Sequence, residues 1–219
     1  MWHTERRGAL KESGWGGLVL SVFPGIDLLG RAFEEAGYCV VRGPDLLWGG
    51  DVRTFHPPAG VFEGVIGGPP CKGESALAFL NGNPGTTLVS EFKRIVKEAR
   101  PAWWVMEAVV KHTAPYTLKL SPRWLGATQS RKRYFHSNLN LAPHVAISLF
   151  EPAEFKHAVL AVHGGREGSI LRGMATYSWV GMCELQGLPP EFDLPGMTRA
   201  GKREAVGNGV PMVIGRAVA

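Results

Sequence analysis

The sequence predicts an α/β fold with a parallel sheet covered by helices on both faces. The 219-residue chain is 45% hydrophobic and 20% charged, as expected for one compact domain or for one domain with a small second lobe. Short apolar runs of strand length alternate with longer segments whose apolar residues recur at helical spacing. Glycine (29) and proline (16) are frequent and fall at many of the junctions. No apolar stretch approaches the roughly twenty residues of a membrane span, so none is predicted.

The first part of the chain contains a strand–helix–strand unit. The apolar run at 18–22 predicts a buried strand, which the following Pro-Gly pair ends. Apolar residues at helical spacing predict a helix over 28–36, with Gly37 as its C-cap. A second strand is predicted at 38–41. Alternation of this kind favours parallel strands joined by crossover helices.

The pattern continues through the middle of the chain. A strand is predicted at 61–66, before the turn Gly-Gly-Pro-Pro. An amphipathic helix is predicted at 88–99, closed by Arg-Pro, and another buried strand at 103–106. Further helices are predicted at 182–188 and 211–218.

Between these parts the pattern loosens, which predicts a small irregular lobe inserted in the main domain. The expected organisation is a lead-in at 1–17, a catalytic and cofactor-binding domain at 18–136, the lobe at 137–180, and a return to the main domain at 181–219.

Charge gives an ambiguous indication of a polyanionic partner. The net charge is +5, and no acidic residue occurs between Glu107 and Glu151. A stretch of one sign is typical of a phosphate-binding face. It is equally compatible with a solvated surface whose counter-charges come from elsewhere in the fold. The basic residues in it are Lys111, Lys119, Arg123, Arg131, Lys132 and Arg133.

Cysteine usage indicates a reducing compartment. Cys39, Cys71 and Cys183 are odd in number and form no CxxC pair, so neither a disulfide scaffold nor a zinc site is expected. Residues 1–17 lack the apolar core of a secretory signal. A cytoplasmic protein without a bound metal is therefore expected.

Two reactive side chains follow predicted strands. Cys71 comes directly after Gly-Gly-Pro-Pro, a rigid turn that would present its thiol at the sheet edge, where Lys72 could favour the thiolate. Glu107 follows the strand at 103–106, and partial burial would raise its pKa and let it act as an acid. Free cysteines are more often structural, and Glu107 could equally form an ion pair at the sheet edge.

Three further segments carry polar candidates. On a strand, Gln129, Arg131 and Arg133 would share one face, which would be costly without an anionic partner such as Glu107 or a phosphate. The glycine turn at 23–27 lies where doubly wound sheets bind ligands. Asp51 could accept hydrogen bonds from an adenine or a ribose, although a turn role is commoner.

The ordered set PPC, a strand ending in Glu, QSRKR, LQGLP and GNGVP resembles the DNA (cytosine-5) methyltransferase family. The resemblance covers most of the chain from Leu18 onward, except the lobe, which falls where this family has its target-recognition region. It implies a Rossmann-like S-adenosylmethionine-dependent methyltransferase sheet with a small target-recognition lobe.

The resemblance also implies a mechanism. Cys71 would attack C6 of a cytosine flipped out of duplex DNA, and Glu107 would favour protonation at N3. C5 would then take the methyl group of S-adenosylmethionine, leaving S-adenosylhomocysteine. Arg131 and Arg133 complete the implied catalytic set, and Gln129 and Lys72 are implied to contact the substrate. The implied cofactor-binding residues are Phe23, Gly25, Ile26, Asp27, Asp45, Asp51, Val52, Pro69, Asn208 and Val210.

The chain departs from the family pattern at four positions. Lys72 replaces a glutamine, Ala108 an asparagine and Asp27 a glycine, and only Asp45 offers itself as the ribose-binding acid. These changes leave an altered methyl donor as an alternative, and Lys72 and Ala108 favour a catalytically silent DNA-binding module. An RNA substrate is a further alternative, because it is compatible with a small recognition lobe. A lobe this small contacts few base edges, so we expect a recognition sequence of about two to four base pairs. A monomer acting in a bacterium or a phage-infected host is expected.

Overall fold

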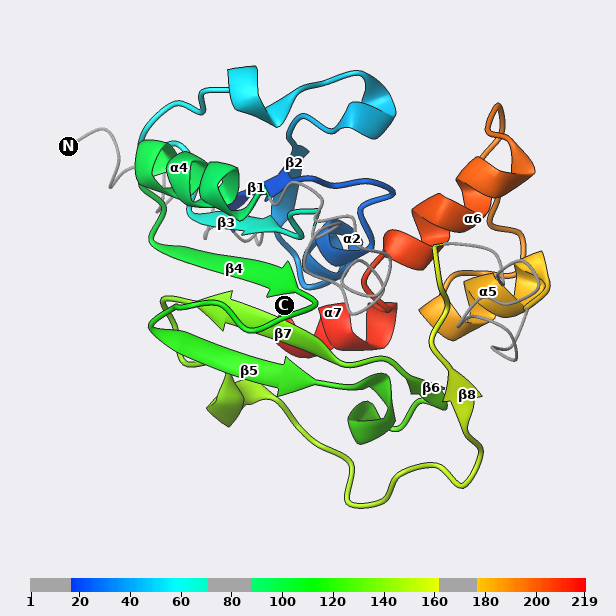
Figure 1. The fold of residues 1–219 in the computed structure, drawn as a ribbon. Helices are drawn as coiled ribbons and strands as arrows, with labels where there is room; N and C mark the ends of the chain where they lie inside the picture. The colour runs from blue at the N-terminus through cyan, green and yellow to red at the C-terminus, as the bar shows by residue number, and fades with distance from the viewer. Residues whose placement is uncertain (1–16, 71–87, 162–176) are drawn as a thin grey trace, which may run out of the picture.

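Six strands pair into one central sheet in the order β2-β1-β3-β4-β7-β5 (Figure 1). The structure is a computed structural model, and it describes residues 17–70, 88–161 and 177–219. The strands of the central sheet are β1 (Leu18–Val22), β2 (Cys39–Arg42), β3 (Gly64–Gly67), β4 (Trp103–Ala108), β5 (Tyr116–Leu120) and β7 (Arg133–Ser137).

The sheet is mixed, so the prediction of a parallel sheet is wrong for one strand. β1 pairs in parallel with β2 and β3, and β3 with β4, but β7 runs antiparallel to both β4 and β5. A parallel neighbour needs a crossover connection, usually a helix. The chain instead reaches β7 through the short 3-10 helix η3 (Pro122–Leu125) and the two-residue strand β6 (Gln129–Ser130).

Helices cover both faces of the sheet, as predicted. α2 (Leu28–Glu35) and α7 (Met212–Val218) pack on one face, and α4 (Val89–Ala99) packs on the other. Strand alternation sorts the side chains: Val105 of β4 lies in the core under α2 and α7, whereas Met106 lies in the core under α4.

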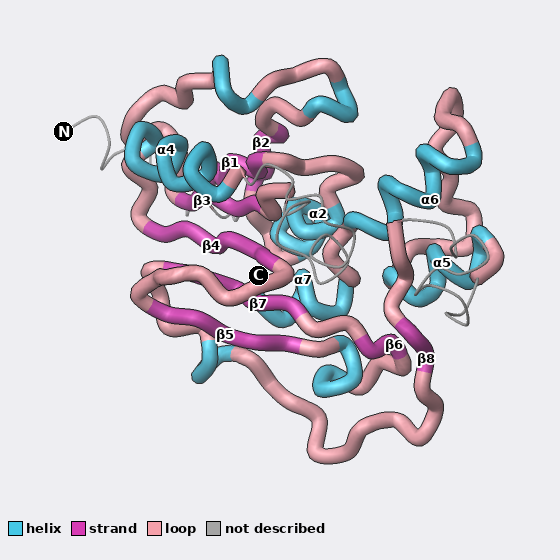
Figure 2. The backbone as a smooth tube through the Cα atoms, viewed as in Figure 1, coloured by secondary structure: helices cyan, strands magenta, loops and turns pink. Residues whose placement is uncertain are grey.

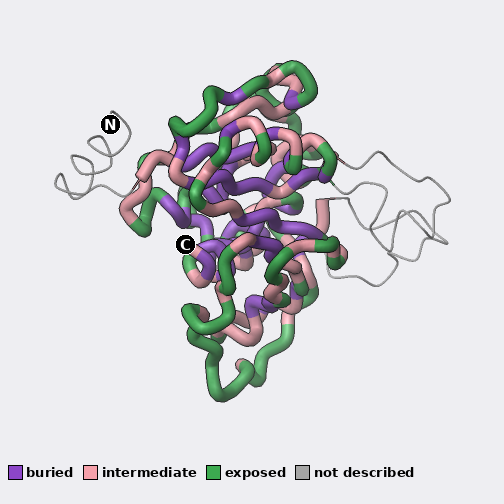
Figure 3. Tube along the Cα trace, turned by 90° about the vertical axis from the view of Figure 1, so that its left-hand side faces the viewer, coloured by how far each residue is buried: buried purple, intermediate pink, exposed green. Residues whose placement is uncertain are grey.

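A smaller unit lies beside the carboxyl ends of the parallel strands. It contains α5 (Trp179–Gln186), α6 (Arg199–Asn208) and the strand β8 (Lys156–His157), which pairs with β6. A third apolar cluster, with Met182, Cys183 and Val206, joins it to α2. The connection from β7 to β8 contains only the 3-10 helix η4 (Ala142–His144) and is drawn mostly as loop in Figure 2. Much of it is exposed in Figure 3.

Most predicted elements are confirmed within a few residues. Gly37 takes the left-handed conformation after α2, with φ 93°. The third strand starts at Gly64, because the residues before it form a turn. α6 was not predicted, since its sequence has little apolar periodicity. Gly207 and Asn208, the first two residues of the GNGVP segment, form its last residues.

Two short 3-10 helices, η1 (Leu46–Trp48) and η2 (Val52–Thr54), follow β2 at the same edge of the sheet.

Candidate functional site

The carboxyl ends of β3 and β4 bring the Gly-Gly-Pro-Pro turn beside Glu107. The parallel register pairs Gly67 with Met106, so Gly68 lies next to Glu107. A Cβ atom at Gly68 would lie 3.0 Å from Oε2 of Glu107. This close approach explains why the position holds a glycine.

Glu107 forms an ion pair with Arg133. The Glu107 Oε1 and Arg133 Nε atoms are 2.6 Å apart, and the two side chains are only 11% and 16% exposed. Glu107 is opposite Phe135 across the β4–β7 pair, and Arg133 precedes Phe135 by two residues, so all three share a sheet face. A carboxyl group held this way can form hydrogen bonds with a ligand nitrogen while Arg133 fixes its orientation.

The predicted strand carrying Gln129, Arg131 and Arg133 is interrupted, and the three side chains have different partners. β6 ends at Ser130 and β7 begins at Arg133. Gln129 Nε2 donates to the Leu185 carbonyl at 2.7 Å, and Arg131 donates to the Val159 carbonyl at 2.6 Å. Of the three, only Arg133 pairs with Glu107. β6 leaves the central sheet to pair with β8, which explains the difference.

Arg131 is a buried cation close to this pair. Burial, and after it the neighbouring Arg133, lowers the pKa of the Arg131 guanidinium to about 9, while Glu107 acts in the opposite direction. Arg131 is therefore charged at neutral pH. Its Nε has no hydrogen-bond partner among the described residues.

Cys71 and Lys72 lie outside the described residues. The chain is described up to Pro70, and Pro69 is buried.

A second group of polar atoms surrounds the loop between β1 and α2. Phe23, Gly25 and Asp27 all have positive φ values, between 56° and 57°. The Gly25 N–H donates to Asp45 Oδ2 at 2.9 Å, and Trp48 Nε1 donates to the Gly25 carbonyl at 2.7 Å. No described heavy atom lies within 4 Å of a Cβ built at Gly25. The loop is thus fixed from one side and has open space beside its backbone.

Comparisons with known proteins agree on the fold. No family model matches the sequence, and no curated protein is detectably similar to it. Solved structures do match over nearly the whole chain. An E. coli prophage protein described as a candidate DNA modification methyltransferase aligns with TM-score 0.60 and 15% identity, over 93% of this chain and 97% of that chain.

Two eukaryotic structures match similarly. The Entamoeba histolytica methyltransferase EhMeth gives TM-score 0.58 at 10% identity, over 91% of this chain and 95% of that one. A DNMT2 variant from Spodoptera frugiperda gives TM-score 0.61 at 11% identity, over 92% of this chain and 98% of that one. The chain has a Rossmann-like methyltransferase fold.

In this methyltransferase fold the other predicted cofactor residues have differing environments. Asp51 caps η2 and pairs with Arg53 at 2.8 Å, so its carboxylate is already engaged. The side chains of Val52 and Val210 belong to the apolar cores, Ile26 packs beside the third cluster, and Asn208 is exposed at the end of α6.

The basic stretch is not a uniform phosphate face. Arg123 pairs with Glu151 at 2.9 Å and donates to the carbonyls of Pro152 and Glu154. Three of the six basic residues, Arg123, Arg131 and Arg133, therefore have partners within the fold, whereas Lys111, Lys119 and Lys132 are exposed.

Sequence reasoning missed two residues at these sites: Trp48 and Arg42. Trp48 is 60% exposed, beside the exposed Leu46. Arg42 Nε lies 2.9 Å from Asp27 Oδ2. A tryptophan three residues after Asp45 was the available signal for Trp48, whereas Arg42 reaches Asp27 only because β2 pairs with β1.

Asp27 is a buried carboxylate at the start of α2. It is 3% exposed, accepts from Ser21 Oγ at 2.7 Å and from the Gly30 N–H at 3.1 Å, and pairs with Arg42. Burial raises its pKa above the usual value, although Ser21 and Arg42 oppose that effect. The charged carboxylate is therefore less favourable in the folded chain than in the unfolded one.

The Asp27→Asn variant is expected to unfold at the same or a higher temperature than the parent at pH 7. The native pKa is raised, so the parent loses stability as pH rises from the ordinary aspartate value through the native one. Asparagine tolerates the left-handed conformation, and its Oδ1 can accept from both Ser21 and Gly30. Its amide nitrogen cannot accept from Arg42, but the Arg42 side chain is 48% exposed and keeps its pair with Glu34. Thermal unfolding from pH 3.5 to 7 tests this, and a variant less stable than the parent throughout that range would contradict it.

No helix in the described ranges is long and apolar enough to cross a membrane. Within those ranges no cluster of three or more histidine, cysteine or acidic residues could hold a metal ion.

Proposed function

We propose that the protein is a DNA (cytosine-5) methyltransferase that uses S-adenosylmethionine. The observation that carries the proposal is the Glu107–Arg133 pair at the carboxyl edge of the sheet, in contact range of the turn that leads into Cys71. A thiol nucleophile and an acid must converge on one pyrimidine for this chemistry. The turn and the carboxylate occupy neighbouring strand ends, which supports that convergence.

The proposed reaction uses the Cys71 thiolate and the Glu107 carboxyl group together on one cytosine. The Cys71 thiolate adds to C6 of the cytosine while Glu107 binds N3 and favours its protonation, so that C5 becomes nucleophilic. Arg133 holds the Glu107 carboxyl group through the ion pair. C5 then takes the methyl group that bound S-adenosylmethionine would supply, and S-adenosylhomocysteine would leave. Loss of the C5 proton to a base and expulsion of the Cys71 thiolate restore the aromatic ring and the enzyme.

The residues around the β1–α2 loop fit an adenosyl cofactor. Trp48 offers an exposed aromatic face for an adenine. The Asp45 carboxylate binds the N–H groups of Gly25 and Leu47 and still has acceptor capacity for a ribose hydroxyl. The open space at Gly25 lets a ligand approach the backbone. When bound, S-adenosylmethionine supplies the methyl group.

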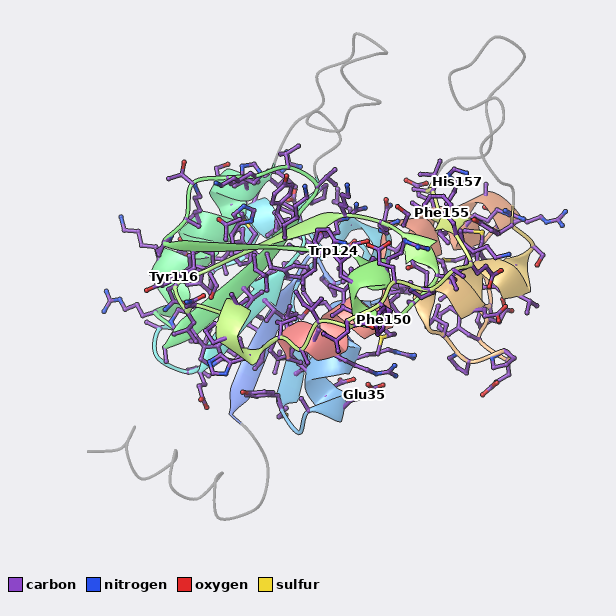
Figure 4. The ribbon with its side chains drawn as sticks, turned by 90° about the horizontal axis from the view of Figure 1, so that it is seen from below. Glu35, Tyr116, Trp124, Phe150, Phe155 and His157 are labelled. Carbon is purple, nitrogen blue, oxygen red and sulfur yellow. The ribbon has the colours of Figure 1, made fainter. Side chains whose placement is uncertain are left out.

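The proposed partner is double-stranded DNA. The target base must leave the stack, at a cost of a few kcal/mol, before it can reach a site recessed at a sheet edge. The segment from β7 to α5 is the proposed target-recognition lobe. It exposes Phe155 and His157, which pack edge to face and lie close together in Figure 4.

The test is transfer of a radiolabelled methyl group from S-adenosylmethionine to duplex DNA, compared with transfer RNA. Label in DNA as 5-methylcytosine, with a covalent complex on a duplex containing 5-fluorocytosine, is the expected result. Label only in RNA favours an RNA substrate. Duplex binding without either label or adduct favours the silent module, and both of these results overturn the proposal. Bisulfite sequencing of host DNA after expression then gives the sequence context.

A further inference from the structure

The buried side chain of His136 contacts the backbone both before and after Glu107 in the sequence. His136 lies in the middle of β7, is fully buried, and faces Met106 of β4 across the strand pair. It is adjacent to Phe135, which shares a face with Glu107, so the imidazole lies on the opposite face of the sheet, toward α4. The proposed reaction does not use it.

Both imidazole nitrogens contact backbone on β4 or just beyond it. Nε2 accepts the N–H of His112 at 2.8 Å, and Nδ1 lies 3.4 Å from the carbonyl of Met106. Met106 immediately precedes Glu107. His112 lies in the return loop, which we define as residues 109–115, between the end of β4 and the start of β5. Figure 1 shows this loop running back from the tip of β4.

These contacts require one protonation state. Since Nε2 faces an N–H donor, it must carry a lone pair, and the single proton of a neutral ring is then on Nδ1, directed at the Met106 carbonyl. A second proton on Nε2 would set two donors against each other and release the return loop.

We propose that His136, in its neutral Nδ1-protonated form, is the positioning residue for Glu107. By holding the backbone before and after Glu107, it fixes the carboxyl group against Arg133 and against the Gly68 turn. This inference rests on the proposed function, because it assigns a purpose to Glu107. Under this proposal, protonation of His136 at low pH breaks its contact with His112 and releases the return loop.

The surroundings favour the neutral ring. Burial lowers the pKa of His136 below the usual histidine value, and the nearby His112, Lys93 and Lys111 act in the same direction, while the Met106 carbonyl opposes them. Lys93 belongs to α4, and the His112 ring centre is 5.5 Å away. Tyr134 of β7 also lies near the ring. At neutral pH the link is therefore intact.

Two substitutions of His136 distinguish the effect of its hydrogen-bond acceptor from the effect of its ring volume. His136→Gln keeps a carbonyl acceptor that can reach the Nε2 position, and it cannot be protonated near neutral pH. His136→Phe keeps the ring volume but offers no acceptor to His112. His56→Phe is the control, because His56 is an exposed histidine outside the proposed target-recognition lobe.

Hydrogen exchange of the return loop tests the link without any enzymatic assay. At pH 7 the His112 amide is expected to exchange about tenfold faster or more in His136→Phe than in the parent, while His136→Gln and the His56 control remain near the parent. Unchanged protection in His136→Phe would overturn the proposal. The nitrogen chemical shifts of His136 in the parent report the tautomer directly, so a protonated Nε2 at pH 7 would also overturn it, even if the variants failed to fold.

The pH profile of methyl transfer distinguishes positioning from general support of the fold. In the parent, kcat and the protection of the return loop are expected to fall together as pH drops below the usual histidine pKa, with the KM for DNA unchanged. His136→Gln should lack this acid limb, and His136→Phe should have a low kcat at every pH. A loss of kcat together with return-loop protection at low pH that persists in His136→Gln would overturn the proposal, whereas an acid limb in kcat alone would report the Cys71 thiolate.

Thermal unfolding is recorded at each pH. Because the native pKa is lowered, stability that is present above the usual histidine pKa decreases as pH falls below it, and rates are compared only where the chain is folded. If neither the parent nor any variant transfers methyl groups but exchange responds as expected, the proposed function fails and the anchoring role of His136 stands. If transfer occurs and His136→Phe retains full kcat, the function stands and this inference fails.

Discussion

Replacing Glu107 with glutamine is expected to lower kcat for methyl transfer by about 10²- to 10⁴-fold, the usual contribution of a positioned acid. Glutamine preserves the size of the side chain, and its carbonyl can still accept from Arg133 Nε, which lies 2.6 Å from the carboxylate in the parent. It cannot deliver a proton to N3. The loss should therefore appear in kcat, and the affinity for S-adenosylmethionine should stay unchanged.

Glu98→Gln is the matched control. Glu98 also pairs with an arginine, Arg94 at 2.9 Å, but it lies on α4 away from the strand ends. Its rate should stay within about twofold of the parent, since a partly exposed i,i+4 helix pair contributes little and lies away from the site. Rates and melting temperatures are measured for both variants. A folded Glu107→Gln protein as active as the Glu98 variant would exclude Glu107 as the acid.

The local sequence was sufficient to predict the parallel half of the sheet and not the antiparallel half. The apolar runs of β1, β3 and β4 are buried on both faces, and each is followed or preceded by a helix with clear periodicity. β7 includes the polar residues Arg133 and His136. The connection that leads to it contains no α-helix, so the local sequence does not indicate the direction of the strand. That direction is set by pairing with β4 and β5, which are distant in sequence.

The candidate site, like the sheet, could be predicted only in part from the local sequence. Glu107 could be located because it comes at the end of an apolar strand, and it was one of the two anionic partners, with a phosphate, expected for the face that carries Arg133. The separate partners of Gln129 and Arg131 could not be foreseen, because the carbonyls of Leu185 and Val159 come from segments 56 and 28 residues further along the chain. Alternation predicts a common face only while the strand continues, and this strand stops at Ser130.

Gly67→Ala is expected to lower both stability and activity, because it separates the strand ends that carry the site. A Cβ at Gly67 would lie 2.4 Å from the Val22 carbonyl oxygen and 3.1 Å from the ring of Phe92. Gly67 and Val22 are partners in the β1–β3 register, so neither backbone can withdraw without loss of pairing. Overpacking of this kind costs about 1–3 kcal/mol.

For a chain of this length, each kcal/mol shifts the melting temperature by about 2–4 °C, so a decrease of roughly 2–12 °C is expected. Val22 leads directly into the Phe23–Asp27 loop, and Gly67 into the turn beside Glu107, so the affinity for S-adenosylmethionine should weaken as well.

Gly201→Ala is the matched control: Gly201 lies in α6, where the nearest atom to an added Cβ is the Thr198 hydroxyl at 3.3 Å. Alanine there should be neutral or stabilise the helix by about 0.5–1 kcal/mol. Equal melting temperatures for the two variants would show that β1 and β3 can move apart freely, and the tight approach at the strand ends would then have no energetic consequence.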